Sequence, residues 1–221
     1  MLVTSRSVHE YEAFFDLTPE NPAGRVLDCC AGASGFAAAV RNGGGRVAAV
    51  DPAYGMDRRA LLHRAKASTT QGARIVADHD DRFTWSWYGS PAKREELRRE
   101  ALDAFITDLQ THPGNYVAGA LPRLPFADSS FDLALCSHLL FTWSDALDEQ
   151  WHLQALLELS RVARQVRVFP LVVQGTGAPV PFLPRVLDRL CGDGHRVEVT
   201  RVAYEFQRGA NQMLIVERGG H

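Results

Sequence analysis

Short apolar segments alternate with amphipathic segments along the chain, a pattern that predicts alternating strands and helices. Apolar runs bounded by turn residues predict strands at 24–30, 46–51, 115–121, 131–137 and 166–173. Amphipathic stretches predict helices at 5–17, 36–44, 56–68, 90–109, 148–163 and 181–194. The chain closes with two further strands, 196–206 and 212–218, which the turn residues 207–211 would join as a hairpin.

The first helix carries a clear start signal. Ser7 is followed three residues later by Glu10, the spacing of a capping box in which each side chain binds the other's backbone N–H. Tyr11, Phe14 and Phe15 then share one face of the helix. We therefore expect this helix to pack on the sheet.

The order of elements predicts a three-layer α/β domain. Residues 25–51 form one strand–helix–strand unit, whose crossover is right-handed and whose strands are therefore parallel. The terminal hairpin adds an antiparallel strand to an otherwise parallel sheet. We expect a single domain over residues 1–221, with 55–115 as a helical and aromatic insertion, a possible substrate lid. Ligands of such sheets bind beyond the carboxyl ends of the strands.

Composition narrows the function classes. The 221 residues carry a net charge of -2, which gives no electrostatic footprint for a nucleic acid. No segment is apolar enough to span a membrane, and the N-terminus lacks a signal-peptide core, so we expect a cytoplasmic protein without a membrane partner. The four cysteines lack metal-ligand spacing, which favours reduced, buried thiols and no metal site.

Two acids mark the ends of the first two predicted strands. Asp28 precedes a turn of small residues, where a dinucleotide-binding loop would have G-x-G-x-x-G to receive a pyrophosphate. A carboxylate there would repel phosphate and attract a cation, which disfavours a dehydrogenase. Asp51 stands where an acid could accept hydrogen bonds from ribose hydroxyls. S-adenosylmethionine has a ribose, an ammonium and a sulfonium, and no phosphate.

These residues resemble the class I S-adenosylmethionine-dependent methyltransferases. The segment VLDCCAGASG (26–35) is similar to their first motif, D/E-x-G-x-G-x-G, and VAAVDP (47–52) is similar to their second. The segment at 121–141 resembles their fourth-strand region, and LLELSRV (156–162) resembles the helix before the fifth strand. The resemblance implies a Rossmann-like seven-stranded sheet with an antiparallel last strand, and S-adenosyl-L-methionine as the cofactor.

Three features depart from the family pattern. Cys30 and Ser34 replace the outer glycines of the first motif, which implies a more crowded loop with negative φ at both positions. No acid follows the third strand, where Gly119 and Ala120 lie instead. Residues 163–166 replace the usual Pro-Gly-Gly before the fifth strand.

The resemblance and the strand ends together imply a cofactor-binding set. Its members are Arg6, Tyr11, Asp28, Ala31, Gly32, Ser34, Asp51, Pro52, Tyr54, Leu121, Pro122 and Ser137. Within it, Arg6 could pair with the methionine carboxylate. Asp28 could equally cap the following helix, Asp51 could be a surface acid, and Tyr11 could serve only in helix-on-sheet packing.

His138 is the candidate catalytic residue, because it follows the fourth strand, where this fold meets the transferring methyl group. It could act as a general base for a hydroxyl or a protonated amine. It could instead bind a loop carbonyl or pack on the cofactor. Cys30 is not expected to be a nucleophile. Phe83, Trp85 and Trp87 recur at period two with Tyr88 beside them, and they could form a substrate wall or belong to the core.

We therefore expect a methyltransferase that acts on a small molecule, with the acceptor atom and the oligomeric state open. One alternative is an RNA or protein methyltransferase, favoured by a basic stripe of Lys93, Arg94, Arg98 and Arg99. Interleaved glutamates make this stripe typical of a solvated helix face. The other alternative is a module that binds the cofactor without catalysis.

Overall fold

Seven strands lie side by side in one sheet in the order β3-β2-β1-β4-β5-β7-β6. They are β1 (Arg25–Cys29), β2 (Arg46–Val50), β3 (Tyr116–Val117), β4 (Phe131–Ser137), β5 (Ala163–Phe169), β6 (Arg196–Arg201) and β7 (Gln212–Glu217). Neighbouring strands from β3 to β5 pair in parallel, whereas β7 is antiparallel to both β5 and β6. The computed structural model describes residues 2–18 and 24–219. The predicted Rossmann-like fold with an antiparallel last strand is confirmed.

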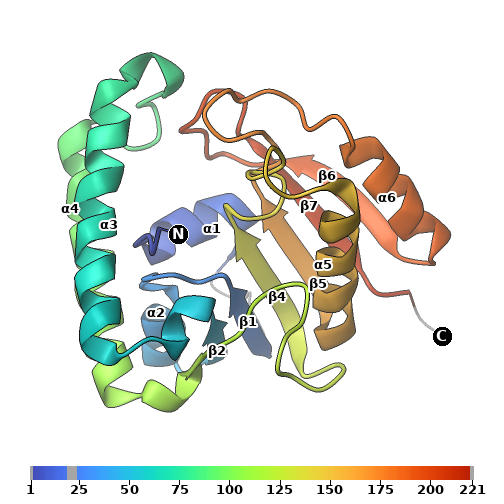
Figure 1. Ribbon diagram of the computed structural model, residues 1–221, viewed down its shortest axis with the longest axis horizontal. Coiled ribbons are helices and arrows are strands. Elements are labelled where there is room, and N and C mark those ends of the chain that lie inside the picture. The colour runs from blue at the N-terminus through green and yellow to red at the C-terminus, as the bar shows by residue number, and fades with distance from the viewer. Residues whose placement is uncertain (1, 19–23, 220–221) are drawn as a thin grey trace.

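Helices cover both faces of this sheet (Figure 1). They are α1 (Val8–Phe15), α2 (Phe36–Asn42), α3 (Arg58–Asp78), α4 (Pro91–Thr111), α5 (Glu149–Val162) and α6 (Leu183–Gly192). Three short 3-10 turns lie at Pro52–Gly55, Asp80–Arg82 and Pro113–Asn115. The helices α3 and α4 stand together at the β2 side of the molecule (Figure 1).

Alternation along the strands divides the apolar side chains between the two faces of the sheet. On one face, Leu156 and Leu159 of α5 and Leu190 of α6 pack in the same cluster as alternate residues of β1 and β4. On the other face, Tyr11 and Phe14 of α1 pack with side chains from β4 and β5. The helix-on-sheet contact predicted for the first helix is therefore present, and the parallel strands are buried on both sides.

The N-terminal segment is fastened between α3 and the loop after β1. The Val3 N–H donates to Ser68 Oγ at 3.0 Å, and the Ser5 and Thr69 hydroxyls lie 3.2 Å apart. The helix α3 continues to Asp78, beyond the predicted end at residue 68, although Val76 is the one buried residue among its last nine positions. The helix is stabilised by what packs on it rather than by its own pattern.

Three predicted strands differ from the observed ones by more than one residue at an end. The strand predicted at 166–173 lies at Ala163–Phe169, because Pro170 has no N–H to continue the ladder. It starts directly after α5, so residues 163–166 belong to the strand itself. The strand predicted at 115–121 shrinks to Tyr116–Val117, and that predicted at 196–206 ends at Arg201.

A buried carboxylate joins α1 to the insertion. The Glu10 side chain is fully buried, and one of its oxygens accepts hydrogen bonds from Ser7, as the predicted capping box requires. Its other oxygen lies 2.7 Å from a nitrogen of Arg98, 3.6 Å from one of Arg6 and 2.5 Å from the Tyr88 hydroxyl. Burial alone would raise the pKa of Glu10, but the two arginines outweigh it and hold that pKa below its usual value.

Replacing Glu10 with glutamine should destabilise the protein severely. The substitution keeps the shape but leaves two buried arginines without their shared anion, a loss of about 3 kcal/mol or more in the free energy of unfolding. Urea denaturation of the two proteins measures this difference. Glu12→Gln, on the exposed face of the same helix, is the matched control and should differ from the wild type by less than about 0.5 kcal/mol. Equal losses in the two variants would contradict the role of Glu10.

Candidate functional site

A cavity of about 580 Å³ lies across the carboxyl ends of the strands. It begins beside Asp51 after β2, passes the loop after β1 and His138 after β4, and reaches Phe169 in β5 and Phe206 between β6 and β7. Residues of the N-terminal segment, α3 and α4 form its remaining walls. This is the position in which open α/β sheets bind ligands, and the volume is typical of a small-molecule site.

The loop after β1 is held close to the N-terminal segment. The N–H of Ala33 donates to the carbonyl of Thr4 at 3.0 Å, and that of Gly35 donates to the carbonyl of Arg6 at 2.9 Å. Gly32 has a φ of 59°, and a Cβ there would lie 2.9 Å from the Thr4 oxygen, so only glycine fits. The expectation of negative φ at Cys30 is wrong: this residue has a φ of 61° and lines the cavity.

Asp51 lies at the β2 end of the cavity, where the sequence places it. One carboxylate oxygen accepts the Gly32 N–H at 3.1 Å, and the other accepts the Ala53 N–H at 2.8 Å. Burial raises the pKa of Asp51, and these two hydrogen bonds oppose the rise. The side chain therefore ties the loops after β1 and β2 together, and Asp51 belongs to the cavity's lining.

Asp28 is fully buried behind the loop and is not part of the cavity's lining. The Tyr11 hydroxyl donates to its Oδ1 at 2.9 Å, and its Oδ2 has no hydrogen-bond partner among the described residues. Burial raises the pKa of Asp28 to about 8, against which the Tyr11 hydrogen bond acts. In the unliganded protein, the carboxyl is therefore mostly neutral at pH 7, so it does not present the open carboxylate expected from the sequence.

Several predicted cofactor residues support the loops instead of lining the cavity. The Tyr54 hydroxyl donates to the Gly32 carbonyl at 2.8 Å, and Ser34 Oγ accepts the Phe36 N–H at 3.0 Å. Leu121 packs in the core under α5, and Pro52 is exposed at the start of a 3-10 turn. Neither these residues nor Tyr11 and Pro122 belong to the cavity's described lining. Of the predicted set, the lining contains Arg6, Ala31, Gly32, Asp51 and Ser137, with His138 beside them.

His138 has the environment of a neutral imidazole. Its backbone is left-handed, with a φ of 57°, and its N–H donates to the Phe169 carbonyl at 2.7 Å. The ring lies against Phe14 and Phe169, with centroids 5.1 and 5.6 Å away, and Nδ1 is buried with no partner among the described residues. Burial, followed by repulsion from Arg6 and Arg98, holds the pKa of His138 well below its usual value.

The aromatic segment is divided between the two roles that the sequence leaves open. Trp87 packs edge-on against Tyr88 and Tyr204, and Trp85 packs against Phe206, so both tryptophans belong to the core behind the lining. Of the candidate wall residues, Phe83 reaches the lining, beside Tyr204 and Phe206 from the β6–β7 connection. The expectation that a tryptophan would face the cavity is wrong.

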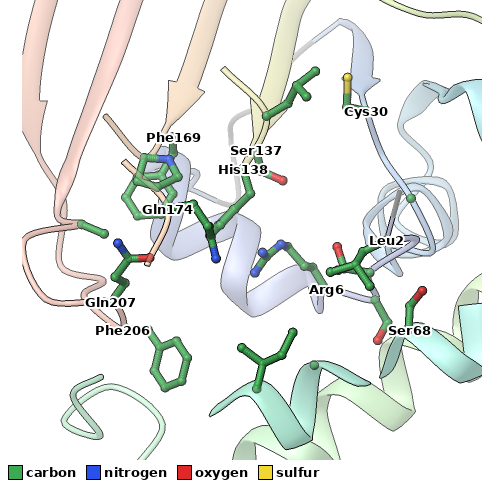
Figure 2. Close-up of a pocket in the computed structure, with 18 of the residues that line it drawn as sticks. Leu2, Arg6, Cys30, Ser68, Ser137, His138, Phe169, Gln174, Phe206 and Gln207 are labelled. Carbon is green, nitrogen blue, oxygen red and sulfur yellow. The ribbon is translucent and has the colours of Figure 1, made fainter. Parts of the chain in front are cut away.

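Sequence reasoning missed part of the lining. These residues are Leu2, Thr4, Ser5, Ser68, Thr69 and Gln174. Figure 2 shows Leu2 and Ser68 on one side of the cavity, Phe206 and Gln207 on another, and the Arg6 side chain extending between them. The small polar residues after position 67 could have indicated that α3 takes part in the lining. Small side chains on a helix face let a second stretch of backbone, here the N-terminal segment, lie close to the helix.

The sheet order, the small-residue loop with its buried acid, and Asp51 after β2 are arranged as in the class I S-adenosylmethionine-dependent methyltransferases. A family model described as a methyltransferase domain matches residues 93–166, less than half of the chain, which include β3, β4 and α5 and most of α4 and β5. These findings support an S-adenosylmethionine-dependent methyltransferase with S-adenosylmethionine as its cofactor. Among residues 2–18 and 24–219, no helix combines the length and apolar content needed to cross a membrane.

Individual relatives are distant. An uncharacterized protein of Methanocaldococcus jannaschii, MJ0045, is 23% identical over 218 residues, covering 98% of this chain and 96% of its own length. A 1,6-didemethyltoxoflavin-N1-methyltransferase of Burkholderia thailandensis has 15% identity and a TM-score of 0.46, with 89% of this chain and 72% of that chain covered. Magnesium protoporphyrin IX methyltransferase of Synechocystis has 13% identity and a TM-score of 0.47, over 90% and 71%. Because these identities and TM-scores are low, the assignment to a class of enzyme depends on the sheet, the loop after β1 and the family model.

The buried Asp28 should make stability fall with rising pH. Its pKa in the folded protein, about 8, lies above the value of 3.8 expected for an exposed aspartate, so the folded state holds an extra proton between these limits. The contribution of Asp28 to the free energy of unfolding therefore decreases by about 1.4 kcal/mol per pH unit as the pH rises through this window.

Asp28→Asn removes the titration while keeping the shape and the acceptor for Tyr11. Urea denaturation at pH 5 and pH 8 should show the variant gaining stability relative to the wild type at the higher pH. Other titrating groups, His138 included, remain in both proteins and cancel in the comparison. A difference that does not change with pH would show that Asp28 is ionised when folded.

Proposed function

We propose that this methyltransferase transfers a methyl group to a small molecule bound in the cavity, beside the cofactor. The observation that carries the proposal is the extent of the cavity: it continues past His138 to an aromatic wall at Phe83 and Phe206. A site for the cofactor alone would need the half beside β1 and β2. The half under α4 and the β6–β7 connection is left for the acceptor.

The chain's own residues suit the two ends of the cofactor. Asp51 would accept hydrogen bonds from the ribose hydroxyls, and Arg6 would pair with the methionine carboxylate. Gly32 and Ala31 would form the floor between them, with Ser137 at the end of β4. Tyr11, Asp28, Ser34 and Tyr54 act through the loops that they hold. When bound, S-adenosylmethionine supplies an electrophilic methyl group on a sulfonium.

His138 would accept a proton from the acceptor if the acceptor atom is a hydroxyl oxygen or a protonated amine. Its low pKa keeps the imidazole neutral across the physiological range, the state that a base needs. The residue lies in the lining after β4, between the cofactor half and the aromatic wall. The surrounding walls would hold the acceptor in line with the methyl group. This positioning would supply the rest of the rate enhancement, because methyl transfer is an in-line displacement.

The alternative of an RNA or protein methyltransferase loses its main support. Of the basic stripe on α4, Arg94 and Arg98 are buried and line the cavity, whereas Lys93 and Arg99 are exposed. Lys93 also forms an ion pair with Glu96, with 2.8 Å between its Nζ and a carboxylate oxygen. The stripe is therefore divided between the interior and the surface, which favours a closed pocket over an open basic groove.

Asp51→Asn should weaken the binding of S-adenosylhomocysteine by at least about tenfold. A hydrogen bond to a charged group contributes roughly 1.5–3 kcal/mol, and the amide keeps an oxygen for one backbone N–H while removing the charge. Isothermal titration calorimetry measures the affinity. Asp103→Asn, on the exposed face of α4, is the control and should leave the affinity unchanged. Unchanged affinity in Asp51→Asn would refute the ribose assignment.

His138→Gln should lower kcat about a hundredfold and leave S-adenosylhomocysteine affinity intact. The acceptor for this assay is first identified by transfer of label from methyl-labelled S-adenosylmethionine into a small-molecule extract. In the wild type, kcat should stay level as the pH falls past 6.5, because the imidazole protonates only well below that value. Joint loss of cofactor binding and activity would instead assign His138 a structural role.

A further inference from the structure

Three arginines line the same cavity, all of them nearly buried. The side chains of Arg6, Arg94 and Arg98 are 12%, 9% and 8% exposed. Buried cations are costly unless anions accompany them. The acids near each guanidinium therefore decide whether the three positive charges are balanced without a bound anion.

Two of the arginines share one acid. Arg98 binds Glu10 at 2.7 Å and also donates to the Ser5 carbonyl. Arg6 lies 3.6 Å from the same carboxylate, with its guanidinium 5.4 Å from the centre of the Phe14 ring. A single negative charge thus serves two positive charges, and the methionine carboxylate assigned to Arg6 would supply a second.

Arg94 is paired with an acid of its own. Its partner is the adjacent Glu95, 2.5 Å away, whose side chain is 33% exposed and therefore partly solvated. The Nε of Arg94, like that of Arg98, is buried without a hydrogen-bond partner among the described residues. Burial, and then repulsion by Arg98, lowers the pKa of Arg94. Of the described lining residues, Asp51 is the one carboxylate, and it lies after β2.

Arg94 belongs to the acceptor half of the cavity. Its guanidinium lies 5.0 Å from the centre of the Phe206 ring, in the β6–β7 connection. Phe83 stacks on that ring with a centroid distance of 4.5 Å. Figure 2 places Phe206 and Gln207 across the cavity from Cys30, which lies in the loop after β1. A cation thus stands beside a flat apolar wall, away from the cofactor's ribose end.

We propose that the methyl acceptor carries an anionic oxyacid group, a carboxylate or a phosphate, which binds Arg94 while its apolar body packs against Phe206 and Phe83. The inference rests on the proposed methyl transfer in this cavity. A guanidinium binds either oxyacid through paired N–H donors, and Arg94 lines the cavity with a partly solvated acid as its ion-pair partner. Arg98 adds positive charge from the next turn of α4.

The test uses the full chain saturated with S-adenosylhomocysteine, so that the cofactor half is filled. Benzoate and phenyl phosphate are the anionic probes, and benzamide is the neutral probe of similar shape. Titrations followed by NMR should show both anions binding at least tenfold more tightly than benzamide. Arg94→Gln should weaken phenyl phosphate binding at least tenfold, and Arg94→Lys, which keeps the charge, should weaken it less.

Arg99→Gln is the matched control, because Arg99 lies on the same helix and is exposed. It should leave the affinities for both anions unchanged. S-adenosylhomocysteine should bind the Arg94 variants as it binds the wild type. Weaker cofactor binding in Arg94→Gln would assign the residue to the cofactor and overturn the inference.

The comparison of probes within the wild type decides the matter even if Arg94→Gln does not fold. Benzamide binding as tightly as benzoate and phenyl phosphate would overturn the anionic site. Failure of S-adenosylhomocysteine to bind the wild type would overturn the proposed function itself. The two failures are distinct, because the first is seen only with the cofactor product already bound.

Discussion

The carboxylate of Glu10 is the interaction on which the cavity depends. It is fully buried, and it binds Ser7 of its own helix start, Arg98 of α4 and the Tyr88 hydroxyl of the insertion. Tyr88 in turn lies 2.9 Å from the hydroxyl of Tyr204, in the β6–β7 connection. Three segments that are distant in sequence, namely the N-terminal segment, residues 88–98 and the β6–β7 connection, are thus joined through one charge, and all three contribute walls to the site. Because a buried ion group is severely destabilised by loss of one member, these walls are fixed together rather than separately.

The strand order and the cofactor end of the site could be predicted from the sequence, because both depend on short-range rules. Buried strands produce apolar runs, and an acid that follows such a run must lie at the carboxyl edge of a parallel sheet. Asp51 therefore appears in the lining where its position in the chain indicates. Asp28 also lies at its predicted strand end, but the tight loop above it buries the carboxyl group. A sequence pattern does not indicate how far a loop buries the side chain below it.

The acceptor end could not be predicted, because there the direction of each side chain is set by tertiary contacts. Glu10 was identified only as half of a capping box, although it also pairs with Arg98, 88 positions away. Arg94 and Arg98 have the spacing of a solvated helix face, yet α4 turns them inward. The alternation of Trp85 and Trp87 correctly indicated aromatic packing, but the partners that decide which rings face the cavity come from the β6–β7 connection.

The charges of the cavity are distributed unevenly, and this bears on how His138 would act. Asp51 stands after β2 and Arg94 beside Phe206 in the acceptor half, whereas Arg6 is the residue assigned to the methionine carboxylate. Arg6 and Arg98 disfavour the protonated ring of His138, so the unliganded site holds a weak base. A ligand that carries a cationic part and an anionic part would therefore be oriented across this cavity by its charges as well as by its shape.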